Sequence, residues 1–169
     1  MGGIRMWLVL ALVPLGAACS SDSDGSTPGA GGGSNFDGAN ACLNIQNTAT
    51  EITAVGDAGA APAMTGGTLV DGTYFLTART KYGDANWGGW KEKERLDIMN
   101  GGAYLSYVSA QSTGEIRGGL TAKASGKDLT VDGVCSLYAG QHLTLTYTAT
   151  ATTFSSLESN GKLSVYTKQ

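Results

Sequence analysis

The stretch Glu115-Ile116-Arg117-Gly118-Gly119-Leu120-Thr121-Ala122-Lys123-Ala124 decides the fold of this chain. Apolar or small residues alternate with charged or polar residues along it, which is the pattern of a β-strand with one buried face. The turn Ser125-Gly126-Lys127 follows, and a second alternating run starts at Asp128. A strand, a tight turn and another strand predict an antiparallel pair. The side chains expected to face inward are Ile116, Gly118, Leu120, Ala122, Ala124, Leu129 and Val131.

The same alternation continues over most of the chain from residue 68 to the C-terminus. Strands are expected over residues 73–82, 93–100, 103–110, 115–124, 128–137, 142–150, 152–157 and 161–167. Short turns rich in Gly, Asn, Ser and Lys join them, which favours antiparallel neighbours. Eight strands are enough to close an up-and-down barrel with a filled interior. We therefore expect an all-β fold, an antiparallel eight-stranded barrel over residues 68–169, with a two-sheet β-sandwich as the alternative.

The alternation also predicts which side chains line the barrel. In the first strand the inward set is Tyr74, Leu76 and Ala78, and the outward set is Thr77, Arg79 and Lys81. In the second strand Leu96 and Ile98 are expected inside. Acidic residues at 92, 94 and 97 alternate there with basic residues at 91, 93 and 95, and we interpret this run as a solvated strand face. In a later strand the inward set is Leu143, Leu145, Tyr147 and Ala149. Short strands predict a narrow lumen largely filled by side chains. The small inward residues either open a shallow pocket or fit opposite Tyr74, Tyr147 and Leu145.

Three segments carry a resemblance to a known group of proteins. They are Gly72-Thr73-Tyr74-Phe75-Leu76, Arg95-Leu96-Asp97-Ile98 and Leu143-Thr144-Leu145-Thr146-Tyr147-Thr148-Ala149-Thr150. In their order and strand pattern they resemble the small lipocalin-like barrels of uncharacterised bacterial lipoproteins. The resemblance covers about residues 68–169. It implies a barrel fold and a membrane-anchored topology, and it implies no activity.

The N-terminus has the composition of a bacterial export signal over residues 1–18. Arg5 precedes an apolar run of about eleven residues, far fewer than the roughly 20 that a membrane-spanning helix needs. The segment Leu15-Gly16-Ala17-Ala18-Cys19 resembles a lipoprotein lipobox, which implies that Cys19 is lipidated. Because Ser20 follows, the resemblance implies anchoring in the outer membrane of a Gram-negative envelope, facing the periplasm or the surface. The alternative is a soluble secreted protein with an unpaired Cys19.

Two segments separate the lipidation site from the barrel. Residues 19–34 have no large apolar side chain and are expected to form a flexible tether. Residues 35–67 are expected to form an extended arm with one short strand near residues 50–55. The exported chain meets an oxidising compartment, so Cys42 and Cys135 are expected to form a disulfide that pins the arm to the barrel. A metal site of these cysteines with His142 is the alternative, but no paired-ligand spacing such as Cys-x-x-Cys favours it.

Charge and motifs exclude several classes of function. Loss of Arg5 with the signal leaves ten basic residues against fourteen acidic ones, a net charge of −4 with no basic patch, so no nucleic-acid partner is expected. His142 is the only histidine, and the chain has no nucleophile elbow and no phosphate-binding glycine loop. We therefore predict no catalytic residue, no metal site and no cofactor, and we do not expect an enzyme.

One loop has the composition of a binding site. Two tryptophans occur in the Gly-rich segment Tyr82-Gly83-Asp84-Ala85-Asn86-Trp87-Gly88-Gly89-Trp90, at one expected mouth of the barrel. The candidate ligand-binding residues are Tyr82, Asn86, Trp87 and Trp90, because flat aromatic faces beside polar groups suit a small hydrophobic or glycan-like ligand. Alternatively the indoles plug the barrel end, or they form a patch for an envelope protein partner. The predicted function is ligand binding, and the alternative is a structural or protein-interaction module with a solid barrel.

Overall fold

A computed structural model describes residues 45–111, 114–135 and 139–169. Their regular structure is entirely β, and they contain no helix of the length and apolarity that could cross a membrane. The strands are β1 (Ile52–Thr53), β2 (Val55–Asp57), β3 (Gly72–Tyr82), β4 (Lys91–Met99), β5 (Tyr104–Gln111), β6 (Gly114–Ser125), β7 (Asp128–Cys135), β8 (His142–Ala149), β9 (Thr153–Leu157) and β10 (Lys162–Lys168).

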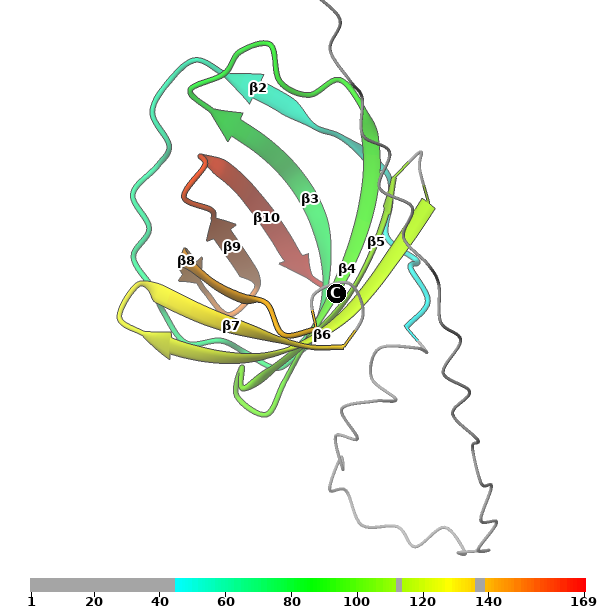
Figure 1. The fold of residues 1–169 in the computed structure, drawn as a ribbon, viewed down its shortest axis with the longest axis vertical. Helices are drawn as coiled ribbons and strands as arrows, with labels where there is room; N and C mark the ends of the chain where they lie inside the picture. The colour runs from blue at the N-terminus through cyan, green and yellow to red at the C-terminus, as the bar shows by residue number, and fades with distance from the viewer. Residues whose placement is uncertain (1–44, 112–113, 136–138) are drawn as a thin grey trace, which may run out of the picture. The chain divides into compact units, whose positions relative to one another are not determined.

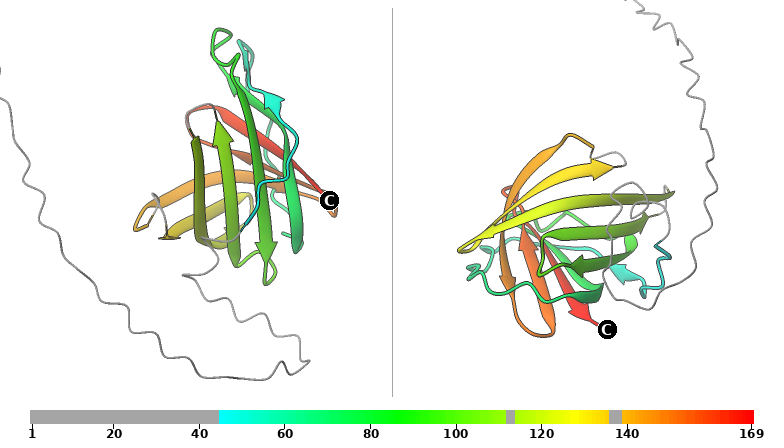
Figure 2. Two further views of the ribbon diagram at one scale, coloured as in Figure 1. Left: turned by 90° about the vertical axis from the view of Figure 1, so that its right-hand side faces the viewer. Right: turned by 90° about the horizontal axis from the view of Figure 1, so that it is seen from below.

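Strands β3 to β10 form a closed barrel (Figures 1 and 2). Each of them pairs antiparallel with the next strand in sequence, and β10 returns to pair antiparallel with β3. This arrangement is the predicted eight-stranded up-and-down barrel, so the sandwich alternative is wrong. Where β3 and β4 pair, closure leaves no free edge in the barrel, which removes the usual route to edge-to-edge aggregation there.

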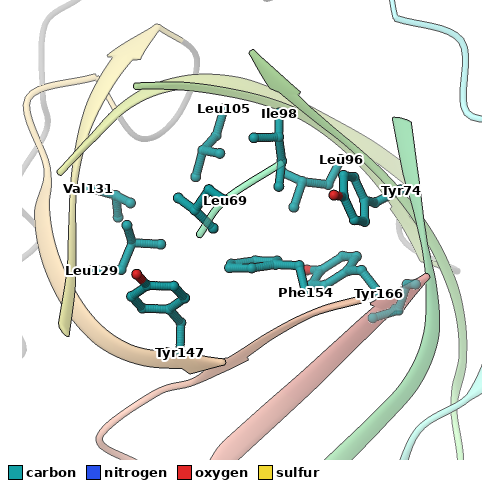
Figure 3. Close-up of a cluster of buried hydrophobic side chains, with 11 residues drawn as sticks. Leu69, Tyr74, Leu96, Ile98, Leu105, Leu129, Val131, Tyr147, Phe154 and Tyr166 are labelled. Atoms are coloured by element: carbon teal, nitrogen blue, oxygen red, sulfur yellow. The ribbon is translucent and has the colours of Figure 1, made fainter. Parts of the chain in front are cut away.

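The core lies inside the barrel (Figure 3). Its buried side chains come from every barrel strand except β6 and from the segment that precedes β3, and the largest are aromatic. They are Leu69, Tyr74, Leu76, Leu96, Ile98, Leu105, Leu129, Val131, Tyr147, Phe154 and Tyr166. The predicted inward residues Leu129 and Val131 of β7 and Tyr147 of β8 are confirmed among them. Leu145 and Ala149 are partly buried against the core, and Leu143 is exposed. Gly118 is buried as expected, and its missing side chain makes room for the ring of Tyr107, its partner on β5.

A β-bulge corrects the predicted faces of β3. Val165 of β10 pairs with Ala78, and Tyr166 pairs with Leu76, so Thr77 is an extra residue in the ladder. One inserted residue reverses the alternation beyond it. Ala78 is consequently exposed and Arg79 is buried, the opposite of the sequence prediction.

The interpretation of β4 as carrying a solvated charged face was wrong for its two glutamates. Glu92 and Glu94 are buried, on the same inward face as Leu96 and Ile98. Strict alternation continues through the whole strand, so of its charged residues only the basic ones and Asp97 lie on the outer side. The inward charges are tolerated because Arg79 enters the interior through the bulge beside them.

The arm fills a seam between β3 and β4. These two strands pair only near the start of β3, and beyond Phe75 they separate. Strand β1 pairs antiparallel with the exposed start of β4, and β2 pairs parallel with the end of β3. The expected single strand near residues 50–55 is thus two short strands divided by Ala54, which is fully buried. Before β1, the arm crosses the outside of the barrel, where Arg117 donates to the carbonyl of Ile45 and Asn47 donates to that of Lys93.

The segment after the arm closes one end of the barrel. Leu69 is buried in the core. Its side chain lies so close to the backbone of Gly102 that a Cβ at this glycine would clash with it. The hydroxyls of two core tyrosines hold the segment: Tyr74 donates to the carbonyl of Val70, and Tyr147 donates to that of Gly67, both at 2.7 Å. The interior is therefore packed at the end where β3 begins.

Candidate functional site

Beside the core, the barrel interior holds a cavity of about 300 Å³. Its lining residues come from all eight barrel strands, and they extend to the end where β8 and β10 begin. A volume of this size falls at the lower end of the range of small-molecule sites. Eight-stranded barrels are the smallest that enclose one small ligand.

Most of the cavity wall is apolar. The aliphatic and aromatic lining residues are Leu96, Leu105, Tyr107, Ile116, Leu120, Leu129, Val131, Leu143, Leu145 and Phe154. Two of them, Ile116 and Leu143, lie near the open end and are 38% and 45% exposed. Such a wall favours burial of an apolar body by roughly 25 cal/mol for each Å² removed from water.

One side of the cavity is a buried ionic cluster, which we name the Arg79 cluster: Arg79, Glu92, Glu94, Ser164 and Tyr166. Arg79 donates from Nη1 to Oε2 of Glu92 at 2.6 Å and from Nη2 to Oε2 of Glu94 at 3.0 Å. Its Nε donates to Oγ of Ser164 at 3.1 Å. The Tyr166 hydroxyl donates to Oε1 of Glu94. Arg79, Glu94, Ser164 and Tyr166 all line the cavity.

The environment of the cluster shifts the pKa of two of its groups. Burial alone would lower the pKa of the Arg79 guanidinium, but the negative charge of Glu94, together with Tyr166 and Glu92, outweighs it and raises the pKa. Burial, and then the neighbouring carboxylate of Glu94, raise the pKa of the Tyr166 hydroxyl well above its ordinary value. Arg79 is therefore a permanent cation, and Tyr166 is a neutral hydrogen-bond donor.

The cluster is not balanced in charge or in hydrogen bonds. One guanidinium faces two carboxylates, which leaves a formal charge of −1 when both are ionised. Oε2 of Glu92 also accepts from the amide of Gln111 at 3.3 Å. Oε1 of Glu92 is buried and has no hydrogen-bond partner among the described residues. A buried acceptor without a donor is costly, so this oxygen needs an explanation.

The rim of the cavity also carries charged and ionisable side chains. Nδ1 of His142 lies 2.6 Å from Oδ1 of Asp132, and Nζ of Lys162 lies 2.6 Å from Oε1 of Glu158. His142, Glu158 and Lys162 all line the opening. Over residues 45–111, 114–135 and 139–169, no three metal-ligating side chains gather into a potential ion site.

The predicted ligand-binding residues lie beside the arm and do not line the cavity. Trp87 and Trp90 are half-buried and contact each other edge to face, with ring centroids 4.4 Å apart. The arm holds their loop, since the amide of Ala54 donates to the carbonyl of Trp90, and that of Gly89 donates to Ala54. Asn86 is exposed, and Tyr82 pairs by its backbone with Gly161. The loop lies at the same barrel end as the opening.

The cysteine predictions fall mostly outside the described residues. Cys135 ends β7, whereas Cys19 and Cys42 belong to the part of the chain that the structure does not describe. The lipidation of Cys19 and the bridge between Cys42 and Cys135 therefore stay predictions.

The polar wall was missed by the sequence analysis. The residues concerned are Arg79, Glu92, Glu94 and Tyr166. One signal was present for the two glutamates, since they continue the period-two pattern of Leu96 and Ile98. No local pattern marked Arg79, because the bulge at Thr77 depends on pairing with β10, a distant segment.

Comparison with known proteins gives no relative from which to transfer a role. No family model, no curated protein and no solved structure matches the chain. The function has to be argued from the barrel and its cavity.

Proposed function

We propose that this protein is a lipid-anchored binding protein of a Gram-negative cell envelope, and that its barrel holds a small, mainly apolar molecule in the lumen. The observation that carries the proposal is the 300 Å³ cavity, closed at one end by Leu69 and lined mostly by apolar side chains. An envelope protein with a solid barrel would have no need to leave a cavity of this size in its interior, since cavities reduce stability.

The opening supports the same proposal. Exposed apolar side chains at the rim, Ile116 and Leu143, give an entering apolar molecule a continuous path from solvent to the lumen. Exposed leucine and isoleucine at the mouth of a cavity are better explained by a ligand than by stability. We place the anchor at Cys19, with residues 20–34 as the tether, from the lipobox resemblance.

A fluorescence titration tests whether the lumen is the site. The probe is N-phenyl-1-naphthylamine, a neutral apolar dye whose emission rises out of water. Leu120→Trp adds bulk to the cavity wall and should weaken dye binding about tenfold, which corresponds to about 1.4 kcal/mol. Leu157→Trp makes the same chemical change on β9 and serves as the control. Because Leu157 follows the inward Ser156, it lies on the outer side of the barrel, and its replacement should leave dye binding unchanged.

A second pair of variants separates the lumen from the tryptophan loop. Trp87→Ala and Trp90→Ala should keep the dye affinity of the unmodified protein, because neither residue lines the cavity. If the dye does not bind, or binds equally to the Leu120→Trp variant, the proposal is wrong. A protein partner recovered by crosslinking in cells, together with no dye binding, would favour the structural module.

A further inference from the structure

We propose that the ligand of the lumen carries a positively charged, hydrogen-bond-donating head group, such as a primary ammonium, which binds beside Glu94 and Glu92. This inference rests on the proposed function, and it specifies the chemical class of the ligand. The observations behind it are the excess negative charge of the Arg79 cluster, the unpartnered oxygen of Glu92 and the position of Glu94 on the cavity wall.

The Arg79 cluster is buried, and its charges are not balanced. Arg79 is 7% exposed and Glu92 is 1% exposed, so solvent screens the cluster weakly. Two buried carboxylates share one guanidinium, and an uncompensated buried charge is strongly unfavourable. A second cation in the adjacent cavity would remove this excess. Among the described residues, the basic side chains that line the rim, Lys162 and His142, already face Glu158 and Asp132.

The two carboxylates of the Arg79 cluster also have unused hydrogen-bond acceptor sites. Each oxygen of Glu94 accepts one hydrogen bond, from Tyr166 and from Arg79, although an ionised carboxylate has sites for about four. Glu92 Oε1 accepts none among the described residues. Gln111, whose side-chain amide donates to Oε2 of Glu92, lines the cavity. Glu94, on the cavity wall, therefore has unused acceptor sites, and Glu92 Oε1, in the same cluster, has no donor among the described residues.

An anionic head group is disfavoured by the same geometry. The donors of Arg79 are engaged, with Nε on Ser164, Nη1 on Glu92 and Nη2 on Glu94. A carboxylate or phosphate would have to break one of these ion pairs and would add a third negative charge to the cluster. A neutral head group would leave the excess charge in place. Of the three possibilities, only a cation improves both the charge and the hydrogen bonding.

The test compares three eight-carbon probes with different head groups: octylamine, 1-octanol and octanoate. Their affinities for the purified full-length protein are measured at neutral pH by isothermal titration calorimetry. Octylamine should bind about tenfold more tightly than octanol, and octanoate should bind most weakly. Equal affinities for the amine and the alcohol, or tightest binding of octanoate, would overturn the inference while leaving lumen binding intact.

Two matched variants locate the effect. Glu92→Gln keeps the size and the acceptor for Arg79 but removes the excess charge, so the preference for octylamine over octanol should fall to about twofold or less. Glu115→Gln makes the same change in net charge at an exposed site paired with Arg117, and it should keep the full preference. The head-group comparison in the unmodified protein stands even if Glu92→Gln fails to fold. If none of the three probes binds, the proposed function fails, and the inference fails with it.

Discussion

Replacement of Arg79 by methionine tests how the barrel tolerates charges in its interior. Methionine keeps the length and much of the apolar stem of arginine, so the change removes the guanidinium with little loss of packing. It leaves Glu92 and Glu94 facing each other without their shared cation. The expected result is a large loss of stability with an unchanged strand arrangement.

The magnitude follows from the burial of the three groups. The side chains of Arg79, Glu92 and Glu94 are 8%, 0% and 11% exposed, so no large reduction for solvent screening applies. Two hydrogen bonds between charged groups contribute about 1.5–3 kcal/mol each. Breaking a buried ion pair by removing one partner costs about 3–5 kcal/mol. We expect a loss of about 4 kcal/mol, which is a large fraction of the roughly 5–15 kcal/mol that stabilises a domain.

The assay is urea unfolding followed by far-ultraviolet circular dichroism, with Arg117→Met as the control. Arg117 pairs with Glu115 on the outside of the barrel, where both side chains are about one-third exposed, so the control should cost about 1 kcal/mol or less. A triple variant, Arg79→Met with Glu92→Gln and Glu94→Gln, should recover most of the lost stability, because it leaves no unpaired charge. If Arg79→Met costs no more than Arg117→Met, the account of a buried, tightly coupled cluster is refuted.

Four further predictions concern the rest of the chain. In alkali the unfolding free energy should fall above about pH 10, because the unfolded chain ionises its tyrosines while burial and Glu94 keep Tyr166 neutral in the folded protein. In Tyr166→Phe this fall, measured by urea titration, should be shallower by up to about 1.4 kcal/mol per pH unit. An identical slope in the variant would refute this. Gly56→Val should detach the arm, because a Cβ there lies 2.2 Å from the carbonyl oxygen of Asp84; we expect a loss of about 1–3 kcal/mol and a red shift of tryptophan emission, and unchanged emission would contradict it. Cys42 and Cys135 should resist thiol labelling until the protein is reduced, and labelling before reduction would exclude the bridge. Cys19→Ala should abolish incorporation of radiolabelled fatty acid in cells, whereas continued incorporation would place the lipid elsewhere.

The barrel could be predicted from the sequence alone because each strand is recognisable from its own residues. Alternation at residues 115–124 and 142–150, together with short turns, determines strand identity, direction and neighbours without reference to distant segments. The inward positions of Leu129, Val131, Leu145 and Tyr147 followed from the same local rule. Closure of the barrel was predicted from the number of strands alone.

The candidate site could not be predicted in the same way, because it depends on long-range pairing. The bulge at Thr77 turns Arg79 inward only where β3 meets β10, some 88 residues further along the chain. Glu92 and Glu94 looked solvated because basic residues alternate with them, and the partner that makes their burial possible lay on another strand. The separation of β3 from β4, which the arm fills, also has no local signature. The sequence therefore identified a mouth of the barrel through its tryptophans and missed the polar wall inside.

The most direct test of the lumen as the binding site is a nuclear Overhauser experiment on methyl-labelled protein with bound octylamine. We expect contacts from the alkyl protons of octylamine to the methyl groups of Leu120 and Leu145, which line the cavity. We expect no contacts to the indoles of Trp87 and Trp90, which do not line it. Contacts to the two indoles with none to the lumen leucines would contradict this expectation.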